Sequence, residues 1–171
     1  MTHPVINLDD VPLTDWGKGS FAARIGSVGA RIGSQKLGYR LVVLPPGKAG
    51  WPLHRHHVNE EMFLILEGTG TLRWRDAQGD RHHPVQVGDA ICAPPGGSAH
   101  QIINTSDVDL RYLAVSTMEA PDVMEYPDSG KFGVFAGSAP GGDKNNRMFS
   151  FFGRQSSAVD YWDGEIDSLT R

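Results

Sequence analysis

Hydrophobic residues in this chain come in short runs that glycine, proline and polar turns separate. Residues 37–44 and 61–67 are two such runs, and each is short enough to be one buried strand. Residues 69–75 alternate instead, with Leu72 and Trp74 on one face of an extended chain and polar residues on the other. This period of two is typical of a half-buried strand.

Turn residues between the runs predict how the strands connect. Residues 77–80 read as a turn, so residues 73–75 and 81–83 are expected to form a hairpin. Further strands are expected at residues 90–93, 100–104 and 110–117. Short strands at this spacing, without a segment of convincing helical periodicity, predict an all-β sandwich or barrel.

Composition and charge narrow the class of protein. A chain of 171 residues is most simply one domain that is large enough to bury a core. The formal net charge of −4 and the scattered basic residues argue against nucleic acid and anionic membranes as partners. The sequence has no apolar run of about 18 residues, so no transmembrane helix is expected.

The N-terminus and the single cysteine point to the cytoplasm. Residues 1–5 show no basic region followed by an apolar stretch, so no signal peptide is expected. Cys92 is the only cysteine and can form no internal disulfide, which suits a reducing compartment. Because Ile91 and Ala93 flank it, Cys92 is expected to be a small buried residue.

Three histidines and one glutamate form a candidate metal site. His54 and His56 are two residues apart, so their rings lie on one face of an extended segment. Glu61 begins one apolar run, and His100 begins another. Imidazoles with one carboxylate suit a divalent transition metal better than Mg²⁺ or Ca²⁺, which prefer oxygen ligands. The sequence therefore predicts one ion of Fe, Mn, Ni or Zn per chain.

The spacing around these residues resembles the first motif of the cupin superfamily. His54-x-His56 is followed by four residues, then Glu61, then six residues, then Gly68. The leading glycine departs from the pattern, because Gly47 lies seven positions before His54 where six is usual.

A second stretch resembles the second cupin motif. Gly88 is followed by six residues, then Pro95-x-Gly97, two residues, His100, three residues and Asn104. The motif has one residue more than usual, within the doubled prolines and glycines. The two motifs lie in the expected order and cover about residues 45–105.

The resemblance implies a fold and an organisation for the chain. It implies a double-stranded β-helix, which is a jelly-roll barrel, in a single cupin domain. The barrel core is expected at about residues 21–118, between an N-terminal arm and a C-terminal extension at about 119–171. The extension either covers a barrel face or exchanges between subunits, and the second role is preferred because cupins of this size are commonly homodimers.

Neighbouring residues leave alternatives for two of the ligands. Glu60 would replace Glu61 if the strand register shifted by one, but the spacing to Gly68 favours Glu61. His57 would stand in for His56, although adjacent strand residues point in opposite directions. Histidine ligands usually donate their second N–H to a further group. Candidates for that group are Asn59, Glu60 and Asn104, and Asn104 suits a turn cap equally well.

The walls of the substrate pocket are predicted from apolar residues near the ligands. Each of them would also suit the core. They are Tyr39, Trp51, Phe63, Trp74, Ile102 and Tyr112. Arg40, Arg73 and Arg75 alternate with apolar neighbours, so they are expected on the outer, solvated face. The sequence thus shows no strong binding signature for carboxylate or phosphate.

The four-ligand set predicts a metal-dependent enzyme that acts on a small organic substrate. With iron the reaction would be an oxygenation, and with Mn, Ni or Zn an isomerisation, an epimerisation or a lyase reaction. The alternative is a non-catalytic cupin that binds or senses a sugar or another metabolite. A third hypothesis is a structural or storage role, in which the metal only stabilises the barrel. The fold does not decide among these functions.

Overall fold

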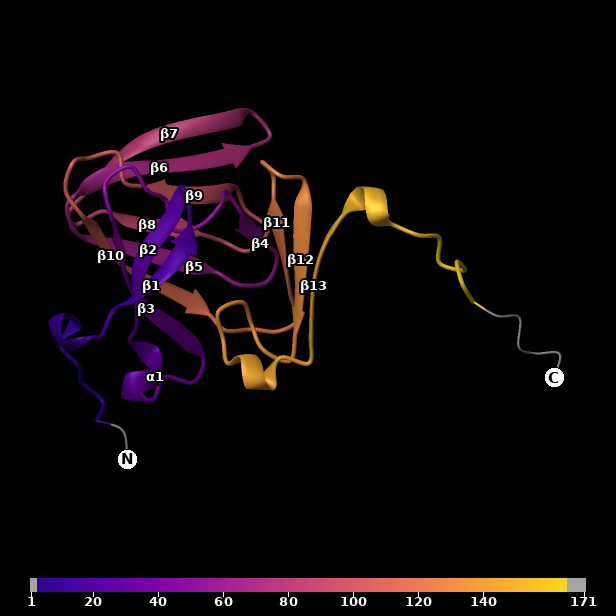
Figure 1. The fold of residues 1–171 in the computed structure, drawn as a ribbon, viewed down its shortest axis with the longest axis horizontal. Helices are drawn as coiled ribbons and strands as arrows, with labels where there is room; N and C mark the ends of the chain where they lie inside the picture. The colour runs from indigo at the N-terminus through magenta and orange to yellow at the C-terminus, as the bar shows by residue number, and fades with distance from the viewer. Residues whose placement is uncertain (1–2, 166–171) are drawn as a thin grey trace.

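The computed structural model describes residues 3–165, and nearly all of its regular structure is β-strand (Figure 1). The strands are β1 (Thr14–Lys18), β2 (Phe21–Ser27), β3 (Leu37–Leu44), β4 (Arg55–His56), β5 (Glu61–Glu67), β6 (Thr69–Asp76), β7 (Gly79–Gln86), β8 (Ala90–Ala93), β9 (Ala99–Ile103), β10 (Leu110–Thr117), β11 (Asp122–Tyr126), β12 (Lys131–Ala136) and β13 (Phe149–Arg154). The helices are α1 (Gly29–Ile32) and the 3₁₀ turns Leu8–Asp10, Lys144–Asn146 and Gln155–Ser157. Within the described range, no helix has the length and apolar character needed to span a membrane.

Three antiparallel sheets build the molecule (Figure 1). The largest has the strand order β1-β2-β3-β10-β5-β8, a second has the order β7-β6-β9, and a third has the order β13-β12-β11-β4. Because β10 pairs with both β3 and β5, strands distant in the sequence lie side by side. The predicted all-β jelly roll is confirmed, and the runs at residues 37–44, 61–67, 90–93 and 110–117 coincide with β3, β5, β8 and β10.

The core lies between the six-stranded sheet and the strands β7 and β9. Tyr112 on β10 stands opposite Val42 on β3 and Ile65 on β5, and all three are buried. Ile102 on β9 and Val85 on β7 belong to the same cluster. Since directly opposed residues share a face of a sheet, these side chains point into the barrel.

The other face of β3 is covered as well. Leu41 packs with Val11 and Val28 in a second cluster, and Tyr39 packs against that cluster. The N-terminal segment and α1 therefore shield the outer face of the sheet. Both faces of β3 are therefore covered, so apolar residues on one of them do not show which face points into the barrel.

One expectation about the core is wrong. Cys92 is exposed, because β8 alternates strictly and the neighbours Ile91 and Ala93 occupy its buried face. Across the ladder, Cys92 lies opposite the exposed Met62. The apolar neighbours predict burial of their own face of the strand only, and Cys92 lies on the opposite face.

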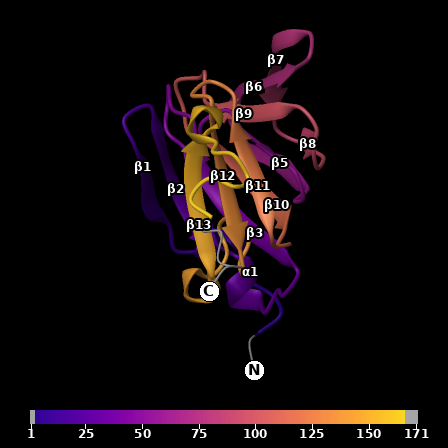
Figure 2. The same ribbon diagram turned by 90° about the vertical axis from the view of Figure 1, so that its right-hand side faces the viewer.

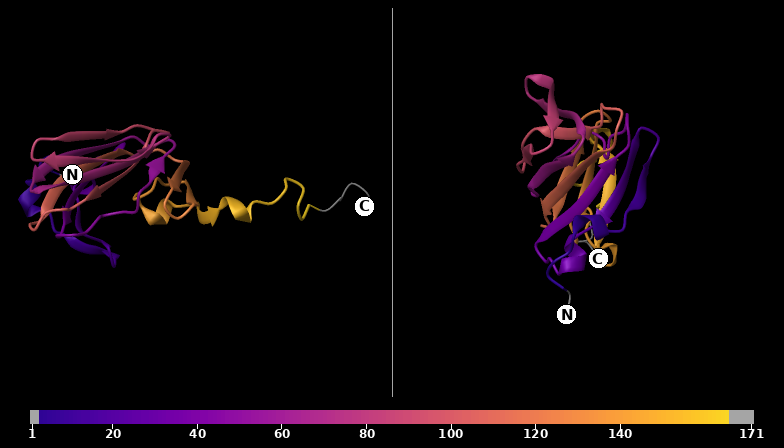
Figure 3. Two further views of the ribbon diagram at one scale, coloured as in Figure 1. Left: turned by 90° about the horizontal axis from the view of Figure 1, so that it is seen from above. Right: turned by 90° about the vertical axis from the view of Figure 1, so that its left-hand side faces the viewer.

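The extension packs on its own barrel. β11 pairs with β4, which carries His56, and β12 and β13 continue that sheet (Figure 2). Residues 155–165 run out from the body of the molecule (Figure 3). In the described residues the extension thus covers a barrel face, whereas its exchange between subunits stays a prediction.

Candidate metal centre

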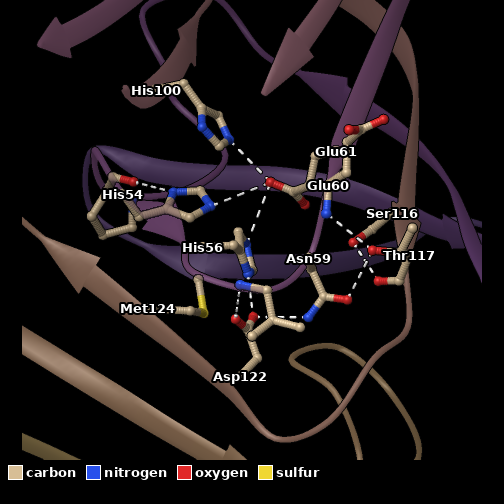
Figure 4. A network of polar contacts seen from close by, with 12 residues as sticks. His54, His56, Asn59, Glu60, Glu61, His100, Ser116, Thr117, Asp122 and Met124 are labelled. Carbon is tan, nitrogen blue, oxygen red and sulfur yellow. Dashed lines mark hydrogen bonds and ion pairs between the residues drawn. The ribbon is translucent and has the colours of Figure 1, made fainter. Parts of the chain in front are cut away.

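Three strands, β4, β5 and β9, and the bridge residue His54 bring the candidate ligands together (Figure 4). The His54 and His100 backbones form an antiparallel bridge, in which each N–H donates to the other's carbonyl at 3.2 and 2.8 Å. His56 lies on β4, and Glu61 is the first residue of β5. Because the bridge links the segment before β4 to β9, residues from both cupin motifs face one point.

The donor atoms converge on one carboxylate oxygen. Oε2 of Glu61 lies 3.0 Å from His100 Nε2, 3.5 Å from His56 Nε2 and 3.7 Å from His54 Nε2. The ligand atoms of His54, Glu61 and His100 all lie within 4.8 Å of one another. Ligands at right angles around an ion with bonds of about 2.0–2.2 Å lie about 3 Å apart. The spacing therefore suits a divalent transition metal, with His56 at the edge of the group.

Hydrogen bonds set the tautomers of two rings. Nδ1 of His54 lies 2.8 Å from the Pro52 carbonyl oxygen, and Nδ1 of His56 lies 2.6 Å from Asp122 Oδ2. A carbonyl oxygen only accepts, and an ionised carboxylate does the same, so both Nδ1 atoms carry the proton. Each Nε2 is then the atom that faces Glu61. Without an ion, a protonated ring donates from it to the carboxylate, and with an ion, a neutral ring offers its lone pair to the metal.

The carboxylate is ionised, as a ligand must be. Burial opposes the charge of Glu61, but the hydrogen bond with His100 and the charges of the nearby His54 and His56 rings hold its pKa well below the usual value. Burial also lowers the pKa of His100. Nδ1 of His100 is buried and has no partner in the described residues, so this ring is held less firmly than the other two.

Asp122 supports the site and was missed by the sequence analysis. Besides His56, its carboxylate accepts hydrogen bonds from Asn59 Nδ2 at 2.9 Å and from the Val58 backbone N–H at 3.0 Å. Asn59 is fixed in turn by Thr117, whose hydroxyl donates to its Oδ1 at 3.1 Å (Figure 4). Asp122 begins β11 in the extension, far from both motifs, and no motif spacing marks it.

The alternative ligands point elsewhere. Glu60 is exposed, and its backbone N–H donates to Thr117 Oγ1. His57 contacts Glu125 instead, with 2.7 Å between Nε2 and Oε1. The structure therefore places Glu61 and His56 at the site rather than their neighbours.

Only one of the three residues expected to support the ligands does so. Asn59 acts through Asp122, as described above. Asn104 instead donates to the carbonyls of Leu44 and Val108, so it caps a turn. Glu60 makes no contact with a ligand side chain among its hydrogen bonds in the described residues.

A cavity of about 830 Å³ adjoins the donor atoms. Of the residues predicted for the pocket, five line it, namely Tyr39, Trp51, Phe63, Ile102 and Tyr112. Tyr39 does so only at the end of the cavity beside α1, because its ring packs with the outer cluster. Trp74 is not among the lining residues, and its side chain is half-buried on β6. The loop at residues 137–143 and Met124, both in the extension, complete the wall.

The arginines divide between the two faces. Arg73 and Arg75 form ion pairs with Asp80 and Asp128, outside the cavity. Arg40 lines the cavity, so its expected place on the solvated face is wrong. Its apolar neighbours Tyr39 and Leu41 belong to the outer face of β3, which the N-terminal segment and α1 cover. The alternation pattern had predicted that this face points into the barrel.

Comparison with known proteins identifies the domain. Residues 40–116 match a family model described as a cupin domain. Auxin-binding protein 1 of Arabidopsis thaliana is 27% identical over 131 residues, which are 73% of this chain and 65% of that protein. An oxalate-binding protein of Thermotoga maritima is 36% identical over 72 residues, which are 42% of this chain and 54% of that protein.

A solved structure shares the fold over nearly the whole chain. It is a sugar phosphate isomerase from a cupin superfamily, from Silicibacter pomeroyi, with a TM-score of 0.69 and 23% identity, and it covers 94% of this chain and 98% of that one. The chain spans only 54% to 65% of the length of the two curated relatives named above. The family-model match, together with the jelly-roll fold, shows that the chain contains a cupin domain.

Proposed function

We propose that this cupin is a metal-dependent enzyme that acts on a small organic substrate in the barrel cavity. The observation that carries the proposal is the convergence of three imidazoles and one carboxylate beside a cavity of about 830 Å³. His54, His56, Glu61 and His100 would hold one ion of Fe, Mn, Ni or Zn. A six-coordinate ion with these ligands keeps two positions for water or substrate, and it would polarise a substrate oxygen.

The chain's own residues prepare the cavity for such a reaction. Phe63 and Ile102 give it apolar walls that exclude water around the substrate. Tyr112 is fully buried, and burial together with the charge of Glu61 raises the pKa of its hydroxyl. The phenol therefore stays protonated and can donate a hydrogen bond to a substrate oxygen.

The proposed reaction classes are oxygenation, isomerisation and lyase chemistry. Elemental analysis of untagged protein tests the proposal, and about one ion per chain is expected. Iron would direct the search to oxygen uptake, whereas manganese, nickel or zinc would direct it to isomerase and lyase panels. Protein that holds no metal, and takes up none on reconstitution, would contradict the proposal.

A second candidate is a binding module without catalysis. Two curated relatives are named for binding, one for auxin and one for oxalate, which supports this candidate. It predicts saturable binding of a small molecule with no product. Calorimetric binding to the metal-loaded protein, followed by product analysis of the same sample, distinguishes the two functions.

We also propose that the chain forms a homodimer. Support comes from one face of β13, on which Phe149 and Phe151 are each about half exposed. Apolar patches of this kind commonly mark interfaces between proteins. Sedimentation equilibrium is expected to give twice the mass of one chain, and Phe151→Glu is expected to shift the mass toward one chain. The exposed Val87, mutated to Glu, serves as the control. Wild-type protein that sediments with the mass of one chain would exclude the dimer.

A further inference from the structure

Arg40 brings a positive charge to a cavity whose other charged lining residues are the carboxylates Glu61 and Asp143, beside three histidines and uncharged side chains. In the described part of the chain, it is the only lysine or arginine that lines this cavity. Glu61, at the metal centre, is the negatively charged group whose field reaches it. A cation in an enclosed, partly apolar space is costly unless a partner offsets its desolvation.

The inward orientation follows from the strand register. Arg40 lies two residues before Val42 and four before Leu44, so it shares their face of β3, which points into the barrel. Its cross-strand neighbours are small, with Ala114 on β10 and Ser27 on β2. These short side chains leave the room that the guanidinium occupies.

The hydrogen bonds of Arg40 are largely unused by the protein. A guanidinium has five N–H donors. Within residues 3–165, the Arg40 side chain makes one hydrogen bond, in which Nη2 donates to the Gly141 carbonyl. No carboxylate of the described residues forms an ion pair with it, although Arg73 and Arg111 each have two. The remaining donors border the cavity.

The loop of the extension holds the guanidinium in place. Gly141 has a φ of +78°, and a Cβ there would collide with Nη2 and Cζ of Arg40. A side chain at this position would therefore displace the guanidinium, and the positive φ favours glycine there. One edge of the guanidinium is thus fixed by the loop, and the other edge is available to a ligand.

The distance to the metal centre sets the size of that ligand. β10 lies between β3 and β5, so Arg40 is two strand spacings, about 10 Å, from the strand that carries Glu61. The long arginine side chain shortens this gap. A molecule with only a few carbon atoms between two polar ends would reach from the guanidinium to the metal centre.

We propose that Arg40 binds an oxyanion, so that the cavity selects a small organic anion. The carboxylate or phosphate of the substrate would accept two hydrogen bonds from the planar guanidinium, and a second oxygen of the substrate would face His54, Glu61 and His100. This inference rests on the proposed function for its second contact only. The contact with Arg40 needs no metal.

Titration calorimetry of the full-length protein, with and without added metal, tests the inference. The probes are succinate, glycerol 3-phosphate and the neutral analogue succinamide. The wild type is expected to bind one of the two anions at least ten times more tightly than succinamide, and the preferred anion tells a carboxylate site from a phosphate site. Arg40→Gln is expected to weaken anion binding at least tenfold, and Arg40→Lys is expected to weaken it less.

A matched control is Arg24→Gln, since Arg24 is an exposed arginine that pairs with Asp109 on the outside of the barrel. It should bind the anion as the wild type does. The inference is overturned if Arg40→Gln keeps wild-type affinity while its circular dichroism is unchanged, or if neither anion binds the wild type. Anion binding that depends on Arg40 in protein without metal would support the inference even if the proposed function failed.

Discussion

Replacing His56 by alanine is expected to lower the affinity for the divalent metal by more than about 100-fold. Groups that only orient a metal ligand commonly contribute 10- to 100-fold, and the loss of a ligand itself costs more. His56 Nε2 faces Glu61 Oε2 at 3.5 Å, and its Nδ1 proton is held by Asp122. Without the ring, three donors remain, and the ion has no replacement ligand from β4.

The neighbouring residue provides the control for this substitution. His57 is also a histidine, but it points away from the site toward Glu125. His57→Ala should bind metal as the wild type does, when both are titrated in competition with a coloured chelator. If His56→Ala kept wild-type affinity, His56 would not be a ligand, and the centre would consist of His54, Glu61 and His100.

Asp122→Asn is expected to weaken metal binding by about 10- to 100-fold without unfolding the protein. The side chain keeps its shape and one acceptor oxygen, but it loses the negative charge that makes the His56 ring a stronger donor to the metal. Burial opposes the charge of Asp122, yet hydrogen bonds with His56 and Asn59 lower its pKa. The carboxylate is therefore ionised at neutral pH, and the substitution removes a full charge.

The same chelator competition measures this effect. Asp109→Asn removes an exposed carboxylate that pairs with Arg24, and it should leave the metal affinity unchanged. A loss in Asp122→Asn that is no larger than in this control would mean that Asp122 only holds the extension against the barrel. Thermal unfolding of both variants separates a local effect on the metal from a general loss of stability.

Much of the barrel could be predicted because its strands are short and are separated by turn residues. The runs that became β3, β5, β8 and β10 are bounded by turn residues, and their lengths suit single strands. The ligands could be proposed because motif spacing fixes them within one or two residues of a strand end. Such local patterns hold without knowledge of what packs against the strand.

Arg40 was misplaced because both faces of β3 are covered. Alternation shows which residues share a face, but it distinguishes inside from outside only when one face meets water. Here Val42 faces the barrel core, while Tyr39 and Leu41 face the N-terminal segment and α1. The apolar neighbours of Arg40 therefore led to the wrong prediction that their face of β3 points into the barrel.

Asp122 could not be found for a different reason. Its contact with His56 joins β11 to β4 across the extension, and only the tertiary arrangement brings them together. A single aspartate in an extension without a motif carries no sign of that partner. Long-range pairs of this kind are set by topology rather than by local pattern.

The central claim is that His54, His56, Glu61 and His100 hold one metal ion beside the cavity. Anomalous X-ray diffraction from crystals of untagged protein, recorded above and below the absorption edge of the metal found by elemental analysis, tests it most directly. The account predicts a single peak per chain, within about 2.0–2.3 Å of the three Nε2 atoms and of a Glu61 oxygen. A peak at other residues, or no peak at this site after soaking with metal, would contradict it.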